Sequence, residues 1–416
     1  MQRDDKIEIR GAYPDELTEV ADLLADRGEP ADAVDMRLVA FDPDEGHASI
    51  LVAVDRDRPV GKRVVATATL LRETLRVGGV DLPAAQVELV ATSRSHEGRG
   101  LVRSLMDLAH SMSRERGDVV QVMIGIPFFY RQFGYVYSMR IPDTRVLDIV
   151  PSADPSIVVR AATDVDIPAM VALQLAEQQH VTVSMPHSPG CWRWLVARDG
   201  SAQWVAERDG VIVATARATP PKEGLVLGEV AGDRPGVESI VAHAHRVAQH
   251  HATAAGSATS AKVEAMDRPG TAVHSVIGPL LAPVDPLGGG HWYYARIERL
   301  APVLDLLRPV LSSRWTAAGG ARAHDVVLSS FRSHVRFRLD DDGMGAVTEG
   351  GPLQAPVSAG GSGVPPDVIA PLLLGPHGAL ALERLHPDVL LGRQREVMAA
   401  LFPPVLSDLL TFYLPV

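Results

Sequence analysis

Two pairs of matching segments form an internal repeat, and this repeat limits the fold of the chain more than any other feature. Residues 9–12 (IRGA) resemble residues 159–162 (VRAA), and an acidic, apolar run follows each segment. Residues 65–68 (VATA) recur as residues 213–216 (VATA), in both cases after a charged turn. Because the segments agree in order and type, they predict two tandem domains of the same α/β design.

The repeat also divides the chain of 416 residues. We predict an α/β (α+β) fold with one mixed-sheet domain over residues 1–152, its repeat over 153–292, and an α+β domain of different texture over 293–416. Residues 291–297 (HWYYARI) follow a glycine linker and have the character of a strand, which we expect to close the second domain or lead out of it.

Composition excludes several classes of protein. Hydrophobic residues make up 46% and charged residues 22%, as in soluble globular proteins, and the charged start of the sequence does not resemble a secretory signal. Apolar stretches are interrupted before they could cross a bilayer, so we expect a cytoplasmic protein without a membrane partner. The net charge of −11 argues against nucleic-acid binding and favours a cationic small molecule.

A single cysteine, Cys191, excludes an intrachain disulfide and any metal cluster with several thiolates from one chain. We expect no metal cofactor. Cys191 has the character of a small core residue.

The region from Ala84 to Gly117 has the order strand, loop, helix. Residues 84–92 (AAQVELVAT) predict a strand, residues 93–100 (SRSHEGRG) a loop, and residues 101–117 an amphipathic helix. Gly98 and Gly100 allow backbone N–H groups to approach a ligand closely, and the following helix presents unpaired amides. The loop is therefore a candidate site for an anion such as pyrophosphate, although an ordinary glycine turn with solvated arginines has the same pattern.

A second motif lies about thirty residues downstream. Residues 119–124 (VVQVMI) predict a buried strand, which residues 126–135 (IPFFYRQFGY) follow directly. Together, the loop HEGRGL and the segment Tyr130-x-x-Phe133-Gly134-Tyr135 resemble the acetyl-CoA loop and the catalytic-tyrosine segment of the GNAT N-acetyltransferase superfamily. Over its full length the chain is similar to the enhanced intracellular survival family, in which a GNAT domain, a degenerate GNAT-like repeat and a sterol-carrier-protein-like domain follow one another.

This resemblance implies an acetyl-CoA site in the first domain. The strand end holds the pantetheine arm through backbone groups, the loop and first helical turn hold the pyrophosphate, and two residues after the next strand flank the cofactor. The residues implied are Val90, Ala91, Thr92, Gly98, Arg99, Gly100, Leu101, Val102, Arg103, Gly125 and Ile126. The repeat lacks a matching loop at residues 230–237, so we expect one acetyl-CoA per chain.

Two positions depart from the superfamily pattern. Glu97 replaces the usual Gln or Arg of the loop, and Val102 replaces a small residue. A carboxylate beside pyrophosphate is unfavourable, so we expect Glu97 to point away or to pair with Arg94, Arg99 or Arg103.

Acetyl transfer to an amine needs a proton donor for the departing thiolate and a base for the amine. Tyr130 is the predicted acid, because a phenol is protonated at neutral pH; its other interpretation is an aromatic core residue. For the base, the resemblance points to the terminal carboxylate of Val416, and Glu88 on the strand before the loop is the alternative.

The sequence therefore predicts an N-acetyltransferase that acts on a primary amine of a small cationic acceptor resembling an aminoglycoside, a polyamine or lysine. A non-catalytic acyl-CoA-binding scaffold is the alternative from a different class, and a transferase for another acyl-CoA or a biosynthetic intermediate is a further one. The resemblance also implies a homo-oligomer such as a hexameric ring.

Overall fold

The computed structural model describes residues 6–221, 224–254, 262–284, 290–320 and 323–412. The chain forms two compact units, each assembled from segments that are distant in sequence. Of the described residues, those within 6–27, 47–140 and 292–407 belong to the first unit, and those within 28–46, 141–291 and 408–412 belong to the second.

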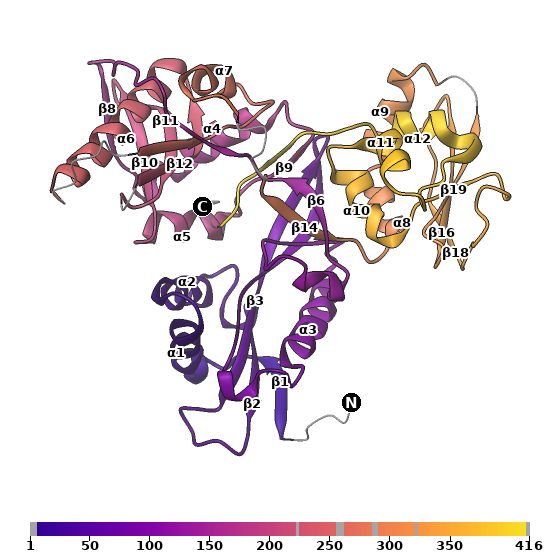
Figure 1. Ribbon diagram of the computed structural model, residues 1–416, viewed down its shortest axis with the longest axis horizontal. Coiled ribbons are helices and arrows are strands. Elements are labelled where there is room, and N and C mark those ends of the chain that lie inside the picture. Colours follow the sequence, from indigo (N-terminus) through magenta and orange to yellow (C-terminus); the bar gives the residue numbers. More distant parts are fainter. Residues whose placement is uncertain (1–5, 222–223, 255–261, 285–289, 321–322, 413–416) are drawn as a thin grey trace. The chain divides into compact units, whose positions relative to one another are not determined.

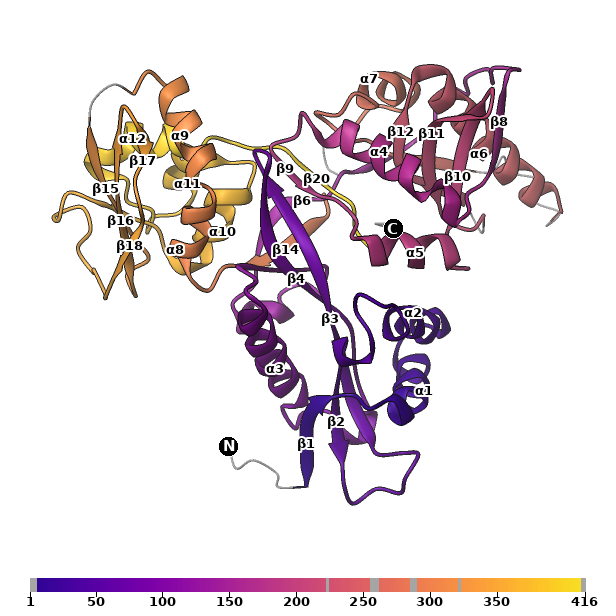
Figure 2. The same ribbon diagram turned by 180° about the vertical axis from the view of Figure 1, so that it is seen from behind.

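A mixed sheet with the strand order β1-β2-β3-β4-β5-β14-β6 organises the N-terminal part of the first unit. Helices α1 and α3 both contact β3 and β4 and lie on opposite faces of the sheet (Figures 1 and 2). The long strands β3 and β4 are joined by Gly78 and Gly79, both with positive φ, as a two-residue hairpin turn requires. The elements are β1 (Ile7–Gly11), α1 (Leu17–Arg27), β2 (Ile50–Asp55), β3 (Val64–Val77), β4 (Val80–Thr92), α3 (Leu101–Arg116), β5 (Val120–Met123), β6 (Val136–Arg140) and β14 (Trp292–Arg296).

Strand β14 lies in this first sheet, antiparallel to both β5 and β6. Its residues belong to the segment that was expected to close the second domain or lead out of it: the strand does not close the second domain, but it leads out of it, because the second unit ends at His291 and the first resumes at Trp292. Strand β14 is an interior strand with neighbours on both edges, and its three central residues, Tyr293, Tyr294 and Ala295, are fully buried. Tyr293 donates to Gln86, whereas Tyr294 packs in the cluster that includes α3, so the two rings serve opposite faces of the sheet.

A second mixed sheet, with the order β7-β13-β12-β11-β10-β8, organises the second unit. Trp204 and Ala206 on β10 pack with α6, whereas Val205 between them packs with α4, so the two helices cover opposite faces. The elements are α2 (Pro30–Ala40), β7 (Thr144–Val146), β8 (Ile157–Ala161), α4 (Ile167–Gln178), β9 (Val183–Met185), α5 (Pro189–Ala197), β10 (Ala202–Arg208), β11 (Val211–Ala218), β12 (Gly224–Gly232), α6 (Arg234–Ala254), β13 (Lys262–Met266) and α7 (His274–Ile277). The predicted fold class, α/β with two tandem mixed-sheet domains, is confirmed.

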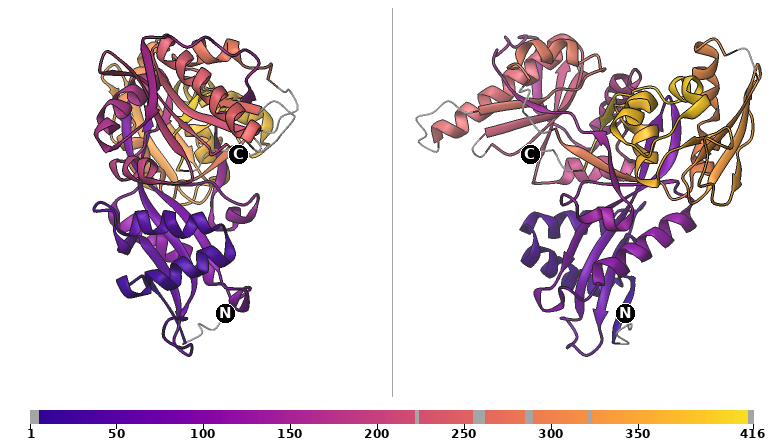
Figure 3. Two further views of the ribbon diagram at one scale, coloured as in Figure 1. Left: turned by 90° about the vertical axis from the view of Figure 1, so that its left-hand side faces the viewer. Right: turned by 45° about the vertical axis from the view of Figure 1, so that its right-hand side comes forward.

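The C-terminal part of the first unit is an α+β arrangement. Its strands follow the order β17-β16-β15-β19, with β18 also paired to β16, and its helices gather on one side of them (Figure 3). Alternate residues of β16 are buried, which is the pattern of a sheet covered on one face. The elements are α8 (Leu300–Leu306), α9 (Arg308–Ala317), β15 (His324–Ser329), β16 (His334–Asp340), β17 (Gly343–Met344), β18 (Thr348–Gly350), β19 (Ser362–Gly363), α10 (Pro366–Leu374), α11 (Gly378–Leu385) and α12 (Arg395–Leu401), and β20 (Ser407–Leu409) follows. None of the described helices is both long and apolar enough to span a membrane.

Candidate active site

The end of β4 is the candidate slot for an extended ligand. Strands β4 and β5 pair in parallel only as far as Gln86 and Val122, and beyond these residues they no longer pair with each other. Between Glu88 and Ala91 the register with β3 shifts, and Leu89 at this bulge has a φ of 51°. A bulge re-aims the strand, and the backbone groups that turn toward β5 are left for a ligand. Val90, Ala91 and Thr92, the residues expected to hold the pantetheine arm, lie in this segment.

The second domain has an equivalent bulge, but there side chains of the same domain form hydrogen bonds with the backbone of the bulge. Glu229 of β12 has a φ of 54° at the equivalent register shift. The carbonyl of Glu229 accepts a hydrogen bond from Gln174, and that of Val230 accepts one from Arg268 at 2.7 Å. Backbone groups that are open to a ligand in the first domain are therefore engaged by buried side chains in the second.

The loop between β4 and α3 presents backbone amides without an internal cap. Gly98 and Gly100 have φ values of 73° and 79°, a region that favours glycine, and a Cβ on Gly98 would meet open space. Gly100 is the N-cap of α3, and its position provides no side-chain cap for the helix. The side chains of Leu101 and Val102 pack in the core. These two residues can therefore contribute to an anion site only through their backbone N–H groups. This set of donors fits a pyrophosphate.

The second domain has no such loop. Asp233 alone joins β12 to α6, and its carboxylate accepts the N–H of Gly236 at 2.8 Å and pairs with Arg208. The N-terminus of α6 is thus capped by the protein itself.

The partner of Glu97 is not one of the three arginines that were considered. Glu97 pairs with Arg27 at the end of α1, and not with Arg94, Arg99 or Arg103. Arg103 donates to the Oε1 atom of Gln132 at 2.7 Å and lies over the ring of Phe133. A residue 70 positions away, Arg27, therefore neutralises the carboxylate that departs from the family pattern.

Tyr130 lies on the short 3-10 helix η4 (Phe129–Phe133), which follows β5. Its ring is buried among Phe129, Phe133, Tyr135 and Tyr294 in edge-on or tilted contacts. A Cβ added to Gly125 would lie 2.4 Å from the Cε2 atom of this ring. Gly125, which the resemblance assigns to the cofactor, thus also makes room for Tyr130.

The carboxylate of Glu88 influences Tyr130 from the opposite side of β4. Burial, and secondly the charge of Glu88, raise the pKa of Tyr130 to about 12. Because Ala85 and Val87 pack toward α3, Gln86 and Glu88 point to the other face of the sheet. There Gln86 donates to Glu88 and accepts a hydrogen bond from the hydroxyl of Tyr293 at 2.7 Å. Burial and the charge of a carboxylate on the other face of the sheet therefore keep the phenol protonated.

Tyr294 is a site residue that the sequence analysis missed. Its hydroxyl accepts the N–H of Phe128 at 2.9 Å and donates to the carbonyl of Ile126 at 3.5 Å, so it joins both sides of the loop before Tyr130. Phe128 has a φ of 67°, a strained value for a phenylalanine, and this hydrogen bond helps to hold it. The ring of Tyr294 also stacks on that of Tyr137, with the ring centroids 4.1 Å apart. The segment HWYYARI contains the residue, but only the pairing of β14 with β5 and β6 reveals its place.

Val416, the predicted base, lies outside the described residues. The tail that precedes it is anchored in the second unit, where Asp408 forms a fully buried ion pair with Arg268. Arg217 donates to the carbonyls of Thr411 and Phe412, both at 2.8 Å. The described residues contain no group of three or more His, Cys, Asp or Glu side chains that could hold a metal ion.

Comparison with known proteins supports the assignment of the first domain. Residues 8–138 match the family described as "Acetyltransferase (GNAT) domain". No curated protein matches the chain significantly.

Three solved structures share the fold over nearly the whole chain. The GCN5-related N-acetyltransferase from Anabaena variabilis is 13% identical, with a TM-score of 0.67 and coverage of 97% of this chain and 98% of its own. The GCN5-related N-acetyltransferase from Kribbella flavida is 16% identical, with a TM-score of 0.66 and coverage of 98% and 100%. Eis1 from Mycobacterium abscessus is 16% identical, with a TM-score of 0.55 and coverage of 97% and 98%. Residues 8–138 therefore form an acetyltransferase domain of the GNAT type, and the protein is an acyltransferase.

Proposed function

We propose that the protein transfers the acetyl group of acetyl-CoA to a primary amine of a small cationic acceptor, of the aminoglycoside, polyamine or lysine type. The observation that carries this proposal is the arrangement of Tyr130 beside the open end of β4, with a pKa of about 12. When bound, acetyl-CoA would supply the acetyl group and a thiolate leaving group. The neutral amine attacks the thioester carbonyl, the C–S bond breaks, and the acceptor becomes an amide.

Within this proposal, the first domain holds a single acetyl-CoA per chain. Val90, Ala91 and Thr92 provide backbone groups for the pantetheine arm, and Gly98, Gly100 and the first amides of α3 bind the pyrophosphate. Arg99 and Arg103 add charge, for which Arg103 would exchange its hydrogen bond to Gln132 for one to phosphate. The pairing of Glu97 with Arg27 supports binding, because it removes an uncompensated carboxylate from the loop.

Tyr130 is the proposed acid and donates its phenolic proton to the sulfur as the thiolate leaves. The proton of the attacking amine goes to a base, for which we propose the carboxylate of Val416, with Glu88 as the alternative. The buried anchoring of residues 408–412 supports the first assignment, and the burial and hydrogen bonding of Glu88, whose charge acts on Tyr130, support the alternative.

The proposal extends to the whole chain. Similarity in fold to Eis1 from Mycobacterium abscessus supports an assignment to the enhanced intracellular survival type, with residues 1–152 as the catalytic domain, 153–292 as its degenerate repeat and 293–416 as a sterol-carrier-protein-like domain. The net charge of −11 favours a cationic acceptor over nucleic acid. We further propose that the protein works in the cytoplasm as a homo-oligomer.

Thiol release from acetyl-CoA in the presence of a panel of amines tests the function. We expect release that depends on the amine, with an aminoglycoside, spermidine or a lysine derivative accepted, and with an acetylated product detected by mass spectrometry. Binding of acetyl-CoA without release for any amine would favour the acyl-CoA-binding scaffold. Faster release from a longer acyl-CoA would favour a transferase for another acyl group.

A further inference from the structure

A cavity of about 860 Å³ lies within the first unit, outside the slot at the end of β4. It is bounded by η4, by β6 and β14, by the turn between β15 and β16, and by α10 and α11 with the residues around them. Small-molecule sites span roughly 300–1,000 Å³, so a ligand the size of a nucleotide fits. Neither Tyr130 nor the glycine loop lines this cavity, and of its lining residues Gln132 contacts Arg103 and Tyr137 contacts Tyr294 of the site described above.

The charged groups of the lining have a small positive excess. Three arginines, Arg131, Arg296 and Arg332, face two carboxylates, Glu298 and Asp367. Glu298 is already compensated, since it pairs with Arg296 and also with Arg114 outside the cavity. In a chain with a net charge of −11, a concave surface with this balance is not a consequence of overall composition.

Two of these arginines are available to an anion. Arg131 and Arg332 come from different walls, η4 and the turn between β15 and β16, and neither forms an ion pair with any residue in the described part of the chain. Asp367 faces the same space and leaves the lining net positive. Arginine forks match phosphate oxygens in geometry as well as charge.

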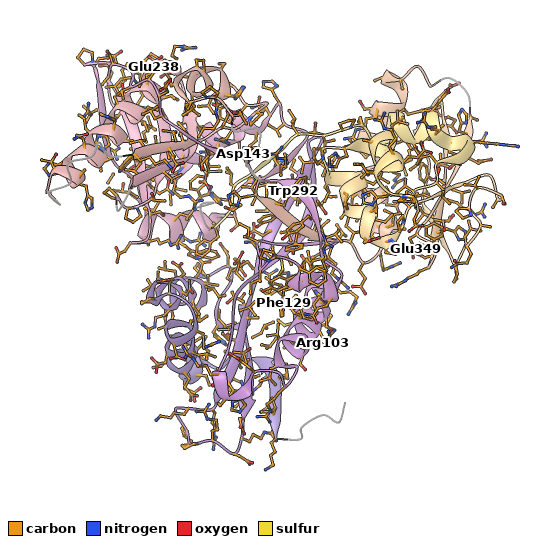
Figure 4. All side chains as sticks on the ribbon, in the orientation of Figure 1. Arg103, Phe129, Asp143, Glu238, Trp292 and Glu349 are labelled. Carbon is orange, nitrogen blue, oxygen red and sulfur yellow. The ribbon has the colours of Figure 1, made fainter. Side chains whose placement is uncertain are left out.

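The cavity also presents flat aromatic surfaces. Trp292, labelled in Figure 4, lies nearly parallel to His377, with ring centroids 6.4 Å apart and an angle of 27° between the planes. Tyr137 contributes a further ring, which is stacked on Tyr294 and has the guanidinium of Arg131 5.9 Å from its centroid, so a base there would pack with the arginine rather than on a bare ring face. Aromatic and arginine surfaces of this kind receive a planar base, and arginine forks receive its phosphate.

We propose that this cavity binds a phosphate-bearing ligand with a planar base, of the size of a mononucleotide. The ligand would contact Arg131 and Gln132, which follow Tyr130 directly on η4, and Gln132 also accepts the hydrogen bond of Arg103 from α3. Occupancy would thus act on the short helix that carries the proposed acid. Two sources share this chemistry: a free nucleotide, and the nucleotide end of acyl-CoA.

Calorimetric titration with AMP and with adenosine tests the site, and it does not depend on acyltransferase activity. We expect AMP to bind at least about tenfold more tightly than adenosine, because adenosine lacks the phosphate. Arg332→Ala should weaken AMP binding about tenfold, and Arg332→Lys should weaken it less because it keeps the charge. Arg338→Ala is the matched control, since Arg338 is an exposed arginine of β16 that does not line the cavity.

Repeating the titrations with saturating CoA distinguishes the two sources. If AMP still binds and Arg332→Ala leaves the CoA affinity unchanged, the ligand is a free nucleotide. If CoA displaces AMP and Arg332→Ala weakens CoA binding but not acetylpantetheine binding, the cavity holds the nucleotide end of CoA. The proposal is overturned if AMP does not bind, if adenosine binds as tightly, or if Arg332→Ala binds AMP as the parent protein does.

Discussion

At the scale of single residues, Gly125 and Tyr130 depend on each other. The ring of Tyr130 occupies the space that any side chain at position 125 would need, so the glycine is required by packing as well as by access for a ligand. Sequence patterns identified both residues from the family motif. They could not show the contact between them, because it depends on how η4 folds back onto the end of β5.

We therefore predict that Gly125→Ala lowers kcat roughly 10²-fold by displacing the ring of Tyr130, since small misplacements of catalytic groups have effects of this size. The KM for the amine should change much less. Steady-state kinetics measure both, and Gly351→Ala serves as the control because a Cβ there meets open space. Full activity in Gly125→Ala would show that the position of this ring is not critical.

The residue that accepts the proton of the attacking amine can also be tested by single substitutions. Extending the chain beyond Val416 moves the terminal carboxylate, and we expect it to lower turnover substantially, whereas Glu88→Gln should have a smaller effect. Glu88→Gln should also lower the pKa of Tyr130, because it removes a negative charge that raises it. The measurement is the pH profile of kcat for both variants. If the rate is intact after tail extension and Glu88→Gln is inactive, the base is Glu88 on β4.

At the scale of elements, β14 completes the site of the first domain. A strand that follows the second domain in sequence lies between β5 and β6 and contributes Tyr294 to the loop before Tyr130. Local hydrophobic patterns predict that residues 291–297 form a strand, but strand neighbours are set by long-range packing. The same limit applies to the pair of Arg27 and Glu97, which joins elements that no local pattern relates.

We predict that Tyr294→Phe lowers kcat about tenfold, because it removes the hydroxyl that accepts the N–H of Phe128 and keeps the ring that packs on Tyr130. The KM for acetyl-CoA should be nearly unchanged, which separates this positioning role from a general loss of structure. Tyr13→Phe, at a site 55% exposed, is the matched control. Equal rates in Tyr294→Phe and the parent would contradict the role of this hydroxyl.

At the scale of the whole molecule, the two domains share a fold but differ in their sites. The glycine loop between β4 and α3 was predictable from spacing, as was the lack of its counterpart in the repeat. The bulge at Glu229 was not predictable, because Gln174 and Arg268 reach its carbonyls from distant parts of the chain. In the second domain, buried side chains therefore occupy the place at the bulge that we propose for acetyl-CoA in the first domain.

We predict that calorimetry gives one acetyl-CoA per chain. Gly100→Asp should abolish binding, because it places a side chain at positive φ and a carboxylate beside the amides of α3. Gly79→Asp, at another positive φ in open space, should bind normally. A stoichiometry near two, or unchanged binding in Gly100→Asp, would refute the assignment of the site.

The most direct test of the central claim is the rate of thiol release by Tyr130→Phe with an accepted amine. The substitution removes only the phenolic hydroxyl, so we predict a fall in kcat of roughly 10²-fold with unchanged affinity for acetyl-CoA. Because the pKa of Tyr130 is raised to about 12, the acid form persists above neutral pH, and this group should not lower kcat of the parent enzyme until the pH approaches that value. A Tyr130→Phe enzyme that turns over at the parent rate would contradict the assignment of Tyr130 as the acid.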